Sequence, residues 1–339
     1  MTDREFRIDR AEEFGDDEFT EFDDYGLPSY VGSTTFQKRP LCDSDEALAA
    51  SGAEVAIVGA PLDDGASNRP GARFGPRAIR QATYHSGDLW SIQLEGEVFS
   101  KVNVVDAGDA PVVPSRLSRG LRVIHEKVLR VARTGAIPVV LGGDHSITYP
   151  SAAAVARAHD RGRVGVVHFD AHADTGREVW GSLVSHGTPM RRLIEEGWVA
   201  GSNFVQVGLR GYWPEKETFD WMREQGMRWH RMVEIEERGA DAVVADAIAE
   251  ALDGPDLIYL SIDVDVIDPG MAPGTGTPEP GGMLTREMLR AVRQIVGAVD
   301  LAGMDVVEVS PPFDHADVTA AVAHRCVLEA ISALAKKKA

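Results

Sequence analysis

Residues 164–174 have the sequence VGVVHFDAHAD, in which an apolar run typical of a buried strand leads into alternating aspartate and histidine. In an extended chain, side chains at positions i and i+2 point to the same side. Asp170, His172 and Asp174 are therefore expected to converge where this strand ends. The segment predicts both a strand and a polar site at its carboxyl end.

Two further segments show the same arrangement. Residues 257–265, LIYLSIDVD, join an apolar run to Asp263 and Asp265, and residues 141–145, LGGDH, end another apolar run with His145. Two imidazoles and four carboxylates are too many ligands for one ion, and four carboxylates balance the charge of two divalent cations. An oxygen-rich set without cysteine favours Mn²⁺, with Ni²⁺, Fe²⁺ and Co²⁺ as alternatives.

Apolar runs alternate with helical patterns along the chain. The predicted strands cover residues 54–59, 102–106, 137–141, 164–169, 204–209, 227–230, 257–263 and 303–309. The predicted helices cover residues 117–134, 151–159, 215–225, 240–252, 285–299 and 318–335. This alternation predicts an α/β fold with a parallel sheet covered on both faces. In such sheets ligands bind beyond the carboxyl ends of the strands, where all three polar segments are predicted.

Composition narrows the functional classes. The chain has 339 residues, 44% of them hydrophobic, and a net charge of −18, which disfavours binding to nucleic acid. Its two cysteines, Cys42 and Cys326, give no disulfide framework. The sequence shows no membrane span and no signal peptide, so we expect a cytoplasmic protein.

The first 40 residues differ from the rest because acidic clusters alternate with aromatic residues. An acidic segment without aromatics would suggest disorder. We therefore expect residues 1–40 to form an arm that packs on the body or on a neighbouring subunit. Residues 41–339 are expected to form a single catalytic domain.

Several motifs together resemble the ureohydrolases, the arginase and agmatinase family of binuclear manganese amidinohydrolases. The motifs are GGDHS (142–146), HFDAHAD (168–174), SIDVDVIDP (261–269), APGTGTPEPGG (272–282), MDVVEVSP (304–311), GAP (59–61) and RPGARFGP (69–76). The resemblance covers the chain from about residue 54 to its end. It implies a three-layer α/β/α fold around an eight-stranded parallel sheet, and homo-oligomers, either trimers or hexamers.

The resemblance also implies a ligand set, with two carboxylates bridging two ions. One ion would be held by His145, Asp170, Asp174 and Asp263, and the other by His172, Asp170, Asp263 and Asp265. His168 is not a ligand in this pattern and is expected to be either a residue of the strand itself or a group behind the ligands.

Two further residues receive roles from the family pattern. His186, in the motif HGTP at residues 186–189, matches a histidine that lies near the substrate and relays protons. Glu308 matches the carboxylate that holds the guanidinium group. Two closely spaced cations can supply hydroxide for attack on the guanidino carbon. Asp174 or His186 would then protonate the departing amine, giving urea and an amine.

Position 176 bears on the choice of guanidino substrate. Arginases normally have an asparagine at this position to hold the α-carboxylate, whereas this chain has Gly176. Arginine is therefore disfavoured, and an agmatinase-type substrate is favoured. Glu178 could meet the distal ammonium of agmatine, and Arg177 the carboxylate of a guanidino acid, as in a guanidinobutyrase. Both side chains could equally be solvated loop charges.

Aromatic residues after two strands suggest another possibility. Trp180, and Trp213 within GLRGYWP (208–214), could shorten the substrate pocket or pack at its rim or at a subunit interface. A shortened pocket would favour free guanidine, small N-alkylguanidines or biguanides, and the segment resembles guanidine-hydrolase-like members that can use nickel.

Two other classes remain as alternatives. A chain of this family could be a non-catalytic partner subunit in a mixed assembly, although the complete ligand set with His186 and Glu308 argues against it. A deacetylase on a related sheet would need one zinc and an oxyanion-stabilising tyrosine, whereas this chain offers two-metal ligation.

Overall fold

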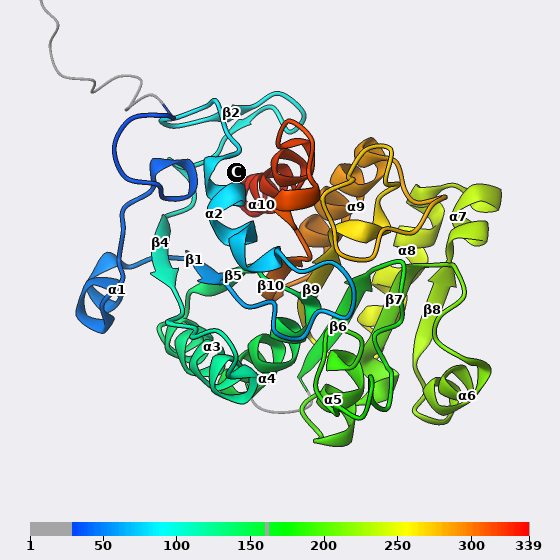
Figure 1. Cartoon of the computed structure of the whole chain (residues 1–339). Helices are drawn as coiled ribbons and strands as arrows, with labels where there is room; N and C mark the ends of the chain where they lie inside the picture. Colours follow the sequence, from blue (N-terminus) through cyan, green and yellow to red (C-terminus); the bar gives the residue numbers. More distant parts are fainter. Residues whose placement is uncertain (1–28, 160–162, 339) are drawn as a thin grey trace, which may run out of the picture.

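The computed structural model describes residues 29–159 and 163–338, and its centre is a parallel sheet of eight strands (Figure 1). The strands are β1 (Val55–Ala60), β4 (Val104–Asp109), β5 (Ile137–Gly142), β6 (Val164–Phe169), β7 (Phe204–Leu209), β8 (Arg228–Arg231), β9 (Leu257–Asp263) and β10 (Leu301–Val307). Their order in the sheet is β4-β1-β5-β10-β9-β6-β7-β8, and every pairing is parallel. All eight predicted strands are confirmed, although β4 begins two residues later and ends three residues later than expected, and β10 begins and ends two residues earlier.

Helices cover both faces of the sheet, which confirms the three-layer architecture (Figure 1). On one face lie α1 (Asp45–Ser51), α3 (Leu117–Arg133), α4 (Thr148–Ala158), α5 (Pro189–Glu195) and α6 (Lys216–Glu224). On the other lie α2 (Gly75–Gln81), α7 (Met232–Arg238), α8 (Ala240–Ala251), α9 (Thr285–Ala298) and α10 (Val318–Lys337). Side chains alternate along each strand, so Val55 and Ile57 of β1 enter one core while Ala56 and Val58 enter the other.

Some short elements were not expected from the sequence. Helices α1, α2, α5 and α7 have seven residues each, which is too few turns for a clear 3.6-residue period. A small antiparallel pair, β2 (Trp90–Ser91) and β3 (Gly96–Glu97), was also missed. Single 3₁₀ turns complete the fold: η2 (Phe36–Lys38), η3 (Ala72–Phe74), η4 (His145–Ile147), η5 (Gly201–Asn203), η6 (Val264–Val266) and η7 (Pro311–Phe313).

The sheet order brings the functional segments together. Strands β5, β10, β9 and β6 are neighbours in the middle of the sheet. Because all run in the same direction, the segments that follow them meet at one edge. Gly143, just after β5, allows a close approach of backbones there, since a Cβ at this position would lie 1.9 Å from the Leu62 carbonyl oxygen.

The expectations for the two ends of the chain can be compared with the structure only in part. Residues 1–28 of the predicted N-terminal arm lie outside the described residues. Within the remainder of the arm, Phe36 is buried and stacks on His324 of α10, with ring centroids 4.3 Å apart. Helix α10 is long and apolar enough to span a membrane, but 78% of that window is buried inside the protein, as in a core helix. Cys42 and Cys326 are both free and buried.

Candidate metal centre and substrate cavity

Register between strands β6 and β9 places the two aspartate-rich segments side by side. Phe169 pairs with Ile262, so Asp170 and Asp263 follow at neighbouring positions. The side chain of Asp263 accepts the backbone N–H of Asp265, and that of Asp170 accepts the backbone N–H of His172. These local hydrogen bonds hold the carboxylates at the strand ends.

The first cluster forms around His145. Its Nδ1 atom lies 3.0 Å from an oxygen of Asp170, 2.9 Å from one of Asp174 and 3.2 Å from one of Asp263. These are the four residues that the sequence analysis assigned to one ion. The structure therefore brings the whole predicted set together from three strand ends.

The Nδ1 atom of His145 fits a metal ligand. It is buried and has no hydrogen-bond partner among residues 29–159 and 163–338, although three carboxylate oxygens surround it. A buried polar atom without a partner is costly, and a divalent cation bound between nitrogen and carboxylates would satisfy it. Burial lowers the pKa of His145, but the carboxylates of Asp170, Asp174 and Asp263 raise it well above its usual value.

The second cluster forms around His172. Its Nδ1 atom lies 3.1 Å from Oδ2 of Asp265 and 3.5 Å from Oδ1 of Asp170. Asp170 thus presents Oδ2 to His145 and Oδ1 to His172, which is the arrangement expected of a bridging carboxylate. Asp263 contacts His145 directly, and its proposed role as a second bridge remains a prediction.

His168 is buried beside the first cluster, but both of its ring nitrogens are already engaged. Its Nε2 lies 2.8 Å from Asp170, and its Nδ1 lies 2.9 Å from Nε2 of Gln206. The same Gln206 nitrogen donates to the carbonyl of Ala173, so it is a donor amide and His168 Nδ1 is an acceptor. His168 Nε2–H therefore donates to Asp170, which supports a role behind the ligands.

The carboxylates crowd one another. Burial, followed by repulsion from Asp265 and Asp170, raises the pKa of Asp263 well above its usual range. Burial and the charge of Asp170 raise the pKa of Asp265 to about 6. Divalent cations between these groups would favour the ionised forms. The raised pKa values and the geometry therefore both indicate that these clusters are suited to hold divalent cations.

His186 and Glu308 form a pair at the edge of the cluster. His186 Nδ1 lies 3.0 Å from Oε1 of Glu308, and the backbone N–H of Ser67 donates to His186 Nε2 at 3.1 Å. Because a backbone amide only donates, Nε2 accepts this hydrogen bond, and the ring proton lies on Nδ1, where it faces Glu308. Burial lowers the pKa of His186, but Glu308, Asp174 and Asp144 raise it to about 9.

Two site residues have strained backbones. Asp174 has φ 50° and Glu308 has φ 66°, in the left-handed region that non-glycine residues rarely adopt. Oε1 of Glu308 accepts the backbone N–H of His145 at 2.7 Å, while Oε2 has no hydrogen-bond partner among the described residues. The strained turn thus buries Glu308 behind His186 with one oxygen unused.

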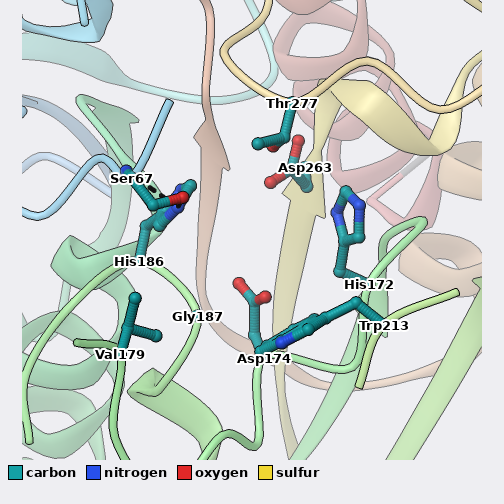
Figure 2. Close-up of a pocket in the computed structure, with 9 residues that line it drawn as sticks. All are labelled: Ser67, His172, Asp174, Val179, His186, Gly187, Trp213, Asp263 and Thr277. Carbon is teal, nitrogen blue, oxygen red and sulfur yellow. Dashed lines mark hydrogen bonds between the residues drawn. The ribbon is translucent and has the colours of Figure 1, made fainter. Parts of the chain in front are cut away.

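A cavity of about 190 Å³ opens onto the cluster. Its lining consists of Ser67, His172, Asp174, Val179, His186, Gly187, Trp213, Asp263 and Thr277. Figure 2 shows His186 and Ser67 on one side, His172, Asp263 and Thr277 on the other, and Asp174 between them. Sequence reasoning missed Ser67, Thr277 and Val179. Ser67 follows the GAP motif but precedes RPGARFGP, so its position between two quoted motifs was the available signal.

Residues predicted to contact the substrate tail fall into two groups. Trp213 lines the cavity, and its ring lies 6.2 Å from that of His172. Trp180 is 86% exposed, and Arg177 and Glu178 are also exposed. None of these three belongs to the described lining of the cavity. Their proposed tail contacts stay predictions.

Gly176 is closely packed against the indole of Trp213. A Cβ at position 176 would lie 2.9 Å from the carbonyl oxygen of Gly187 and 3.2 Å from Cζ2 of Trp213. The backbone N–H of Gly176 also donates to that carbonyl. The space that an asparagine would need for a substrate carboxylate is therefore already filled.

We expect Gly176→Ala to lower the free energy of unfolding by about 1–3 kcal/mol, because the new methyl group overpacks this contact. The matched control is Gly297→Ala in helix α9, where a Cβ would meet nothing within 4 Å. That change should be neutral or slightly stabilising, since alanine favours helix. Urea denaturation of both variants measures the difference. Equal stability of the two variants would contradict the close packing.

Comparison with known proteins gives a consistent result. A model of the arginase family matches residues 53–332. The chain is 40% identical over 316 residues to a guanidinopropionase of Pseudomonas aeruginosa, covering 92% of this chain and 95% of that protein. It is 38% identical over 306 residues to the mitochondrial agmatinase of Gallus gallus, covering 90% and 86%.

The solved structure of proclavaminate amidinohydrolase from Streptomyces clavuligerus superposes with a TM-score of 0.82 at 35% identity. The superposition covers 91% of this chain and 99% of that one. The family match at residues 53–332 spans the sheet and every segment that supplies the two clusters.

Proposed function

We propose that this chain, which belongs to the arginase family and is a hydrolase of amidino carbon–nitrogen bonds, cleaves a guanidino compound to urea and an amine. The match to the arginase family confirms the resemblance to the ureohydrolases. The observation that carries the proposal is the pair of histidine–carboxylate clusters at the floor of a cavity, with His186 and Glu308 beside them.

Members of the arginase family bind a binuclear divalent metal centre, and the two clusters have suitable donors for one. We propose Mn²⁺ as the metal, with Ni²⁺ as the alternative, because the donors are mostly oxygen. Two such ions supply hydroxide near neutral pH by lowering the pKa of a bound water.

The chain's own residues would hold the substrate and move the proton. The unused Oε2 of Glu308 would accept an N–H of the guanidinium, a charge-assisted hydrogen bond. The departing nitrogen must be protonated, and Asp174 lines the cavity next to the clusters. His186 binds a proton readily at neutral pH and would act as the reservoir for this transfer.

The geometry supports a substrate other than arginine. Gly176 has no side chain for an α-carboxylate, and the indole of Trp213 fills the space beside it. The preference for an agmatine-type substrate rests on this feature. The relatives described above are named guanidinopropionase and agmatinase. Both guanidino acids and guanidino amines therefore belong to the candidate substrates.

A second candidate class is favoured by the walls of the cavity. Val179, Gly187 and Trp213 present apolar surface, and the remaining lining outside the clusters and His186 is Ser67 and Thr277. No charged side chain of the described lining stands apart from the catalytic groups to pair with a distal ammonium or carboxylate. Free guanidine and short N-alkylguanidines need no such partner.

The test is a urea-release screen of the purified protein loaded with Mn²⁺ or with Ni²⁺. The substrates are agmatine, 3-guanidinopropionate, 4-guanidinobutyrate, arginine, guanidine and N,N-dimethylguanidine. We expect urea from at least one compound other than arginine. Preference for guanidine or dimethylguanidine would select the short-substituent class, and preference for agmatine would select the amine class.

Two results of the screen would overturn parts of the proposal. Turnover of arginine alone would refute the argument from Gly176. Full metal loading without urea from any guanidine would instead support a non-catalytic partner subunit.

A further inference from the structure

Asp305 is a fully buried carboxylate that the proposed reaction does not use. It lies on β10, and its oxygens accept hydrogen bonds at 2.7 Å from Ser261, Thr148 and Tyr259. All three donors are neutral hydroxyl groups, and no lysine or arginine of the described chain pairs with Asp305. Burying a carboxylate without a cation costs free energy. We therefore expect the Asp305 carboxylate to have a functional role.

The hydrogen bonds around Ser261 have a defined direction. A serine hydroxyl has one proton, and the proton of Ser261 goes to Asp305 because a carboxylate only accepts. The oxygen of Ser261 also lies 3.0 Å from Nε2 of His145. In that contact Ser261 is therefore the acceptor, and His145 Nε2 carries the ring proton.

This direction decides which nitrogen of His145 is free. With the proton on Nε2, the lone pair of Nδ1 is aimed at the oxygens of Asp170, Asp174 and Asp263. A metal ligand needs this lone pair, and a hydrogen bond to the other ring nitrogen is the usual way to orient the ring.

No comparable series of hydrogen bonds reaches the histidine of the second cluster among the described residues. The Nδ1 atom of His172 faces Asp265, and its Nε2 has no hydrogen-bond partner within the described ranges. Any effect of Asp305 on metal binding is therefore expected at the ion held by His145.

We propose that Asp305 and Ser261 are positioning residues that hold the ring of His145 in the tautomer and orientation needed to bind one of the two ions. Asp305 orients the hydroxyl of Ser261, and Ser261 accepts the Nε2–H of His145. Neither residue is one of the predicted ligands or belongs to the described lining of the cavity.

The experiment measures metal binding directly. Metal-depleted protein is titrated with Mn²⁺ against a fluorescent chelator, and bound ions are counted by mass spectrometry. We expect Ser261→Ala to lower the affinity for one of the two ions by about 10–100-fold. This is the usual effect of removing a hydrogen-bond partner of a metal ligand. The affinity for the other ion should stay near that of the unchanged protein.

Matched variants separate positioning from packing. Tyr259→Phe removes a hydroxyl from the same carboxylate but leaves the link from Asp305 through Ser261 to His145 intact. It should keep both affinities. Ser261→Thr keeps the hydroxyl and should restore most of the affinity lost in Ser261→Ala. Asp305→Ala, which removes the acceptor of the Ser261 hydroxyl, is a second route to the same effect if Ser261→Ala does not fold, and it should weaken binding of the same ion.

Two outcomes would overturn the proposal. One is unchanged binding of both ions in Ser261→Ala or in Asp305→Ala. The other is an equal loss of affinity in Tyr259→Phe and Ser261→Ala, which would indicate general core damage. Because no guanidino compound enters the assay, its failure would leave the proposed hydrolase activity untouched.

Discussion

Replacing Asp263 by asparagine is expected to reduce bound metal from two ions per chain to one or fewer, and to abolish most urea release. Asp263 faces His145 Nδ1 at 3.2 Å and is crowded by Asp265 and Asp170. If it bridges, an uncharged amide removes a ligand from both ions at once. We expect the affinity to fall by more than about 100-fold, beyond the effect of losing a partner behind a ligand.

The matched control for this prediction is Asp256→Asn. Asp256 directly precedes β9, at the opposite end of the strand that Asp263 completes, and pairs with Arg163 on the surface. The chemical change is the same, but no cluster residue is near it. Elemental analysis after dialysis should find two ions in this control. Two ions retained in Asp263→Asn would refute the bridging role of Asp263.

Replacing Glu308 by glutamine is expected to lower kcat/KM by roughly 100-fold or more, about 3 kcal/mol, while metal content stays at two ions per chain. Glutamine can still accept the backbone N–H of His145, so the turn after β10 should survive. What it loses is the charge that faces His186 and that would pair with the guanidinium. Steady-state urea release and metal analysis of the same sample give both numbers.

Glu224→Gln is the control for the Glu308 prediction, because Glu224 is exposed at the end of α6 and undergoes the same chemical change. It should turn over substrate like the unchanged protein. Comparable kcat/KM values for Glu308→Gln and the control would remove Glu308 from the reaction. Loss of metal in Glu308→Gln would instead assign it to the metal site.

The sheet and most of the candidate metal site could be predicted from the sequence because their signals are local. Most strands appear as short apolar runs, and each ligand segment follows its strand within a few residues. The spacing of Asp170, His172 and Asp174 places them together through the geometry of an extended chain. Parallel pairing then brings Asp263 beside Asp170.

Other features had no local signal. Trp180 and Trp213 both follow strands, yet one is exposed to solvent and the other forms a wall of the cavity against Gly176. The seven-residue helices α5 and α7 are too short to show a period. Asp305 had no signal of its own in the sequence, because its hydroxyl partners come from two other elements, Tyr259 and Ser261 from β9 and Thr148 from α4.

The sequence by itself determined the eight strands and the histidine- and aspartate-bearing segments that follow three of them, because alternation of apolar and polar residues acts over a few neighbouring positions. Only the tertiary structure decided which groups orient the histidines and which side chains bound the cavity. Ser67 contacts His186 across 119 positions, and Ser261 contacts His145 across 116. Contacts over such separations depend on how the layers pack, and no local periodicity records them.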